Sequence, residues 1–114
     1  MLTIEQLKEY GANTDEGVQR CFGNQEFYLK LVKMMPPDGN FERLYTAVES
    51  GDLDQAFEAA HALKGATGNL SLTPLYDPIQ EITELLRAKT EMDYSALLEQ
   101  IRSAKEELAA LAAD

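Results

Sequence analysis

His61 is the residue of this chain whose type and setting best suit chemistry. It is the only histidine among 114 residues and begins the segment 61–65, His-Ala-Leu-Lys-Gly. At roughly 100° per residue, Gly65 and Gly68 lie one and two turns further along the same helix face, with Lys64 beside them. An interior glycine costs a helix about 1 kcal/mol relative to alanine. Two of them next to a histidine therefore indicate a role that offsets this cost.

An imidazole on a helix strip without side chains suits a nucleophile that a large partner must approach. Histidine is largely neutral near pH 7, so one ring nitrogen can attack a phosphoryl group without first losing a proton. Lys64 can offset charge on the phosphoryl oxygens. Each residue alone has an ordinary explanation: a solvated histidine, a surface lysine, and glycines that allow close helix packing. Their joint placement favours phosphoryl transfer.

Other chemistries find less support in the sequence. Glu58 stands one turn before His61, but it points further into solvent and no second histidine exists, so a metal site is not expected. Ser71 and Cys21 remain possible hydrolytic nucleophiles, although neither sits in a turn motif. No glycine-rich phosphate loop joins a strand to a helix, which argues against nucleotide binding.

Composition limits the class of protein and its partners. With 45% hydrophobic and 26% charged residues, the chain is an ordinary globular domain. Its net charge of −10 argues against nucleic acid and anionic membranes as partners. No apolar run is long enough to span a membrane, and the first residues lack the pattern of a secretion signal. Cys21 has no second cysteine to pair with, so we expect a buried thiol and a cytoplasmic location.

Apolar residues recur at intervals of three and four along the whole chain and predict only helices. We expect helices near 3–11, 15–22, 25–35, 41–50, 52–69, 77–89 and 93–112. The predicted fold class is all-α: an antiparallel four-helix bundle with short additional helices at the amino end. The predicted division is a single domain, 1–114, in which residues 1–23 form the accessory helices and 24–114 the bundle.

Capping residues set several of the expected boundaries. Thr3 with Gln6, and Asp52 with Gln55, match the capping-box pattern at a helix start. We expect Phe22 to face inward with Val18. Because proline is tolerated at the first helical position but not deep inside a helix, we expect Asp77 to be an N-cap and Pro78 to follow it as that first residue. On the 52–69 helix, His61 projects about 110° from the centre of the apolar stripe and is expected to be exposed.

The 61–65 segment, followed by Asn69 and Leu70, resembles the active-site helix of histidine-containing phosphotransfer (HPt) domains, which are helical-bundle intermediates of phosphorelays. The resemblance extends roughly from the 25–35 helix to the end of the chain. It implies that His61 is phosphorylated, that Lys64 interacts with the phosphoryl group, and that Gly65 keeps the approach clear. Two positions depart from the family pattern. Ser71 stands where members commonly have glycine, and Pro78 interrupts a helix that is usually continuous.

The resemblance also implies what the protein works with. It implies a phosphocarrier without kinase activity or cofactor of its own, any magnesium being held by the partner. The implied partners are a receiver domain of a response regulator and a hybrid histidine kinase. We expect a free-standing monomer, although the amino-terminal domain of chemotaxis kinases shares the motif. The alternative is an interaction module that is not phosphorylated and that binds a signalling partner through an apolar surface. We expect the partner surface to include Gly68, Tyr28, Met34 and Met35.

Overall fold

The computed structural model describes residues 1–113, which contain helices and no strands. The all-α class predicted from the sequence is therefore confirmed. Asp114, the last residue of the predicted domain, lies outside the described residues. The helices are α1 (Ile4–Tyr10), α2 (Thr14–Arg20), α3 (Gln25–Lys33), α4 (Asn40–Glu49), α5 (Leu53–Asn69), α6 (Thr73–Arg87) and α7 (Ser95–Ala112).

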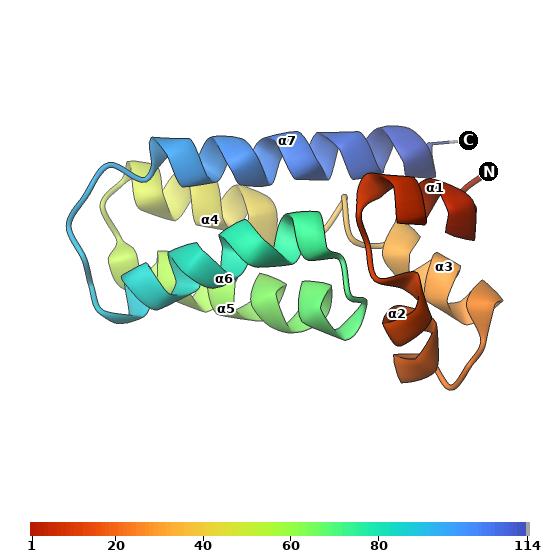
Figure 1. Ribbon diagram of the computed structural model, residues 1–114. Coiled ribbons are helices and arrows are strands. Elements are labelled where there is room, and N and C mark those ends of the chain that lie inside the picture. The colour runs from red at the N-terminus through yellow and green to blue at the C-terminus, as the bar shows by residue number, and fades with distance from the viewer. Residues whose placement is uncertain (114) are drawn as a thin grey trace.

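Helices α4 to α7 form the elongated part of the molecule, and successive helices alternate in direction (Figure 1). Helix α5 packs against both α4 and α6, and α6 packs against α7. The short helices α1, α2 and α3 gather at one end (Figure 1). The predicted boundary at residue 23 between accessory helices and bundle had instead assigned α3 to the bundle. There α1 contacts α7 and α2 contacts α3. None of the helices within residues 1–113 has the length and apolar character needed to cross a bilayer.

One apolar core runs through the molecule and is supplied by every helix of the bundle. Its fully buried members include Phe41, Leu44, Leu63, Leu72, Leu75, Ile79, Ile82, Ile101 and Leu108. The short helices are fastened to it by polar contacts as well. The Tyr10 hydroxyl donates a 2.9 Å hydrogen bond to the carbonyl of Ala104 and so ties α1 to α7.

Helix α6 begins earlier than the sequence predicted. It starts at Thr73 with Pro74 in its first turn, and Pro78 lies inside it. The prediction that Asp77 is an N-cap is therefore wrong, and Asp77 is an exposed helical residue. A proline in a helix interior removes one backbone hydrogen bond and costs about 3 kcal/mol. Burial of Leu75 and Ile79 on either side of Pro78 offsets that cost, which propensity alone does not capture.

The predicted caps are confirmed in part. Thr3 and Gln6 form both hydrogen bonds of a capping box. Asp52 accepts from the backbone N–H of Gln55, but its own N–H already donates to the carbonyl of Ala47. The side chain of Gln55 therefore has no role in a second box and accepts from Arg43 instead.

The end of α2 departs from the expected packing. Phe22 adopts a left-handed backbone conformation, with φ of 61°, and its side chain is 92% exposed. The expectation that it faces the core is wrong because α2 ends at Arg20, so the helical spacing no longer holds at residue 22. Asn24 is the N-cap of α3, and its side chain accepts from the N–H of Phe27.

Candidate functional site

His61 lies on the exposed flank of α5, as its position in the apolar pattern predicted. One face of its ring is covered by Phe57, one helical turn earlier. The two ring centroids are 5.6 Å apart and the planes differ by 17°, which is a stacked arrangement. Within residues 1–113, neither ring nitrogen of His61 has a hydrogen-bond partner. The stack therefore supports the ring while leaving its nucleophilic edge accessible.

Charged side chains of α5 and α6 form a group beside this stack. The Nζ atom of Lys64 lies 3.7 Å from the carboxylate of Glu84, and Arg87 binds the same carboxylate oxygen at 3.3 Å. The guanidinium of Arg87 lies 5.0 Å from the centroid of the Phe57 ring, in a cation–π arrangement. Two cations and one carboxylate thus form a connected group next to the Phe57 ring that stacks on the histidine.

Glycine stands at positions 65 and 68 of α5 for different structural reasons. A Cβ atom added at Gly65 would meet nothing within 4 Å, so packing does not require glycine there. A Cβ atom at Gly68 would lie 3.0 and 3.3 Å from ring carbons of Tyr76, which leans from α6 onto this position. Gly68 therefore makes room for an internal contact, whereas Gly65 leaves open surface beside the histidine.

The end of α5 adopts a turn at Ser71 that favours glycine. The N–H of Leu72 donates to Thr67 and that of Ser71 donates to Gly68, the hydrogen bonds of a Schellman cap. This cap places its first non-helical residue in the left-handed region, which glycine adopts without strain. Ser71 occupies that position with φ of 53°. The backbone at the end of α5 therefore makes the same turn that a glycine would allow, and Ser71 bears the strain of the left-handed conformation.

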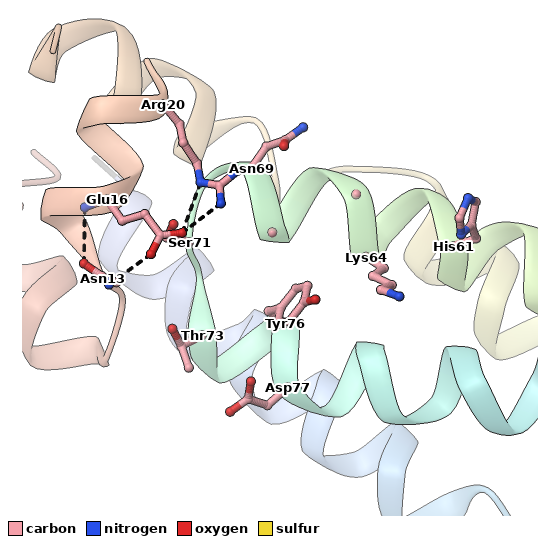
Figure 2. Close-up of a pocket in the computed structure, with 12 residues that line it drawn as sticks. Asn13, Glu16, Arg20, His61, Lys64, Asn69, Ser71, Thr73, Tyr76 and Asp77 are labelled. Carbon is pink, nitrogen blue, oxygen red and sulfur yellow. Dashed lines mark hydrogen bonds and ion pairs between the residues drawn. The ribbon is translucent and has the colours of Figure 1, made fainter. Parts of the chain in front are cut away.

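A cleft of about 490 Å³ extends from His61 along α5 to the short helices (Figure 2). Helix α5 forms its floor, α6 forms one side, and α2 closes the far end. It is lined by Asn13, Glu16, Arg20, His61, Lys64, Gly65, Gly68, Asn69, Ser71, Thr73, Tyr76 and Asp77. Sequence reasoning missed the three residues of the α2 segment because they lie far from His61 along the chain and follow no recognisable motif.

The predicted partner surface is only partly accessible. Met34 is 61% exposed, but Tyr28 is fully buried and Met35 is 4% exposed. The expectation that these last two side chains face a partner is wrong, because Tyr28 on α3 and Met35 in the turn after α3 both pack into the core. Tyr28 fills the space beside Gly17, and its hydroxyl donates to the carbonyl of Leu70.

The residues considered for other chemistries are placed as follows. Cys21 is buried as expected, at 4% exposure, and Ser71 is 8% exposed. Neither therefore presents an open nucleophile for hydrolysis. Among the described residues, no group of three or more histidine, cysteine, aspartate or glutamate side chains is placed to hold a metal ion. Glu58 is engaged by Arg43 at 2.7 Å, away from the imidazole.

The comparison with protein families decides the class of this domain. A family model described as the Hpt domain matches residues 38–113, from the loop before α4 to the end of α7. The chain belongs to the Hpt domain family. Hpt domains serve phosphotransfer in two-component signalling and are phosphocarriers rather than enzymes. Helices α1, α2 and α3 of this Hpt domain precede the matched range. Searches of curated proteins and of solved structures found no match.

Proposed function

We propose that this Hpt domain is a phosphorelay intermediate whose phosphorylated residue is His61. It accepts a phosphoryl group from a receiver aspartate or a histidine kinase and passes it to the aspartate of a response regulator. One observation carries the proposal: an exposed imidazole, with no hydrogen-bond partner within residues 1–113, stands beside the open surface at Gly65. The proposal includes a cytoplasmic monomer that uses no cofactor of its own.

The transfer is a displacement at phosphorus. The lone pair of one ring nitrogen forms the N–P bond while the bond from phosphorus to the donor aspartate oxygen breaks, and the carboxylate leaves with the electron pair. In the neutral ring the other nitrogen carries the proton, so no base on the Hpt domain is required. The same step in reverse delivers the group to the next aspartate. Any magnesium needed is held by the receiver.

Neighbouring residues support this step in distinct ways. The Phe57 ring, stacked on the imidazole, restricts its rotation and keeps its edge outward. Lys64 can move from Glu84, 3.7 Å away, to the incoming phosphoryl oxygens, because an ion pair that is partly exposed is held weakly. Gly65 lets the rim of the receiver's active site close over the ring without meeting a side chain.

The test is to mix the protein with a receiver domain that has been phosphorylated with labelled acetyl phosphate. Wild type should acquire an acid-labile label, and His61→Gln should acquire none while keeping the unfolding transition of wild type. Lys64→Ala should be labelled more slowly. Equal labelling of wild type and His61→Gln would refute the proposal.

A further inference from the structure

The far end of the cleft is built by a part of the chain that precedes the family match. His61, Lys64 and Gly65 come from the matched range, whereas Asn13, Glu16 and Arg20 come from α2 and the residue before it. All six line one continuous cleft (Figure 2). A protein that reaches His61 across this cleft therefore lies against α2 as well.

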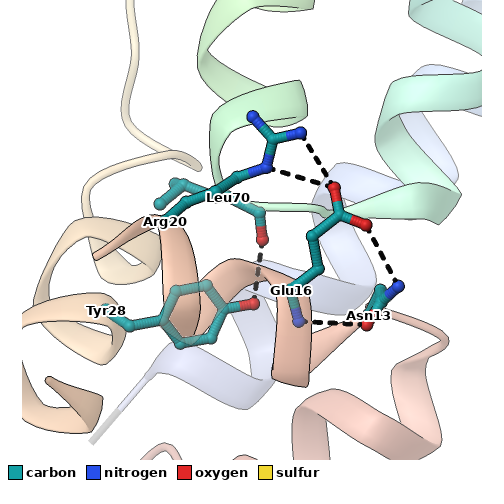
Figure 3. A network of polar contacts seen from close by, with 5 residues as sticks. All are labelled: Asn13, Glu16, Arg20, Tyr28 and Leu70. Carbon is teal, nitrogen blue, oxygen red and sulfur yellow. Dashed lines mark hydrogen bonds and ion pairs between the residues drawn. The ribbon is translucent and has the colours of Figure 1, made fainter. Parts of the chain in front are cut away.

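Helix α2 is fixed to the end of the histidine helix, so its place beside the cleft is a property of the fold. The hydroxyl of Tyr28, from the neighbouring α3, donates a 2.9 Å hydrogen bond to the carbonyl of Leu70 (Figure 3). The backbone N–H of Asn13 donates at 3.0 Å to the carbonyl of Ser71. Gly17 lies so close to the Tyr28 ring that an added Cβ would be 2.4 Å from it. The Tyr28 hydrogen bond is buried, and together with the Asn13 hydrogen bond and the Gly17 packing it leaves α2 little freedom to move separately.

The cleft-facing side chains of this segment form an ordered polar network (Figure 3). Asn13 caps α2 by accepting from the N–H of Glu16, and its amide donates to the Glu16 carboxylate at 3.3 Å. The Nε of Arg20 donates a 3.1 Å hydrogen bond to one carboxylate oxygen of Glu16. The Nη2 of Arg20 forms an ion pair with the same oxygen at 3.0 Å. The guanidinium carries five N–H donors, so this single acceptor leaves several of them unused. With its side chain 51% exposed, Arg20 presents these donors to solvent.

We propose that α2, through Arg20, is a receiver-docking element that selects among receiver domains by pairing with an acidic side chain on the cognate receiver. The inference rests on the proposed function, because it takes the visiting protein to be a receiver. Two observations support the inference. Arg20 and His61 line the same continuous cleft. Arg20 is also an ordered cation on a protein whose net charge is −10. A charge at the rim of an interface acts mainly on encounter and partner choice. Arg20 therefore affects docking and not the displacement at phosphorus.

The experiment compares Arg20→Glu with Arg102→Glu across a panel of purified receiver domains. Arg102 provides the matched control, since it lies over the Tyr45 ring on the α4 and α7 side and does not line the cleft. Both variants change the net charge equally. For the receiver that labels wild type fastest, Arg20→Glu should raise the half-saturating receiver concentration roughly three- to tenfold. The transfer rate at saturation should be unchanged. Arg20→Lys should retain most of the affinity, and added salt should shrink the difference.

Binding is measured by titration separately from labelling, so that the two proposals fail in different ways. Binding that depends on Arg20, without label at His61, would refute the phosphorelay role and leave α2 as a docking element. Label at His61 with equal half-saturation in Arg20→Glu and Arg102→Glu would overturn the docking inference alone. A panel in which no receiver binds would overturn it too.

Discussion

Ser71→Gly should stabilise this protein, because the end of α5 holds a serine in the left-handed region at φ of 53°. A left-handed conformation costs an L-residue roughly 1–2 kcal/mol, and glycine escapes this cost. Glycine also gives the unfolded chain more conformational freedom, which lowers the gain in the free energy of unfolding by roughly 0.4–1 kcal/mol. The Ser71 hydroxyl is buried and has no hydrogen-bond partner within residues 1–113, so its removal adds to the gain. We expect the free energy of unfolding to rise by about 1 kcal/mol.

Urea titration and thermal unfolding measure this gain, and a rise of about 4 °C in Tm is expected for a domain of this size. Ser71→Ala separates the two contributions, since it removes the hydroxyl but keeps a Cβ in the left-handed region. Ser50→Gly is the matched control: Ser50 ends α4 at φ of −83°, and its hydroxyl donates to the carbonyl of Ala47. It should destabilise. The reasoning is refuted if Ser71→Ala accounts for the whole gain, or if Ser71→Gly destabilises as Ser50→Gly does.

Three further outcomes are expected. Gly17→Ala should lower the free energy of unfolding by about 1–3 kcal/mol in urea titration, because its Cβ would lie 2.4 Å from the Tyr28 ring; an unchanged value would contradict this packing. Gly65→Ala should raise the same quantity by up to about 1 kcal/mol, since helical alanine gains over glycine in open space. Gly68→Ala should gain less, because its Cβ would lie 3.0 Å from an aromatic ring of α6; the reverse order would count against both assignments. Burial raises the pKa of Tyr28 and of Tyr45 from 10.0 to about 12. Because these folded pKa values exceed the unfolded ones, the stability that the neutral phenols contribute is present below pH 10 and is lost as the pH rises through about 12. Tyrosinate absorbance followed with pH checks this, and ionisation of both residues near pH 10 in the folded protein would contradict it.

The helical class and most boundaries could be predicted from the sequence because their signals are local. The Thr3 cap, the Asp52 cap and the spacing that exposes His61 each depend on residues within one or two turns. The wrong boundary at α6 has the opposite origin. Pro78 disfavours a helix locally, and only tertiary burial of its neighbours keeps α6 continuous.

The site was predictable only where it lies on one helix. His61, Lys64 and Gly65 follow from helical spacing, whereas the Glu84 and Arg87 contacts require α6 to be placed beside α5. The predicted apolar surface on α3 was partly wrong for a related reason. The structure buries Tyr28 and exposes Met34, and an apolar pattern alone does not show which side of a helix a neighbouring helix covers.

The attachment of the amino-terminal helices has a consequence for how this domain tolerates sequence change. Tyr28 and Asn13 bind main-chain oxygens at positions 70 and 71, and every amino acid supplies such an oxygen. Substitutions at these two positions can thus alter the turn while the anchorage of α2 survives. At this joint the hydrogen bonds require the hydroxyl of Tyr28, but they require no particular side chain at positions 70 and 71.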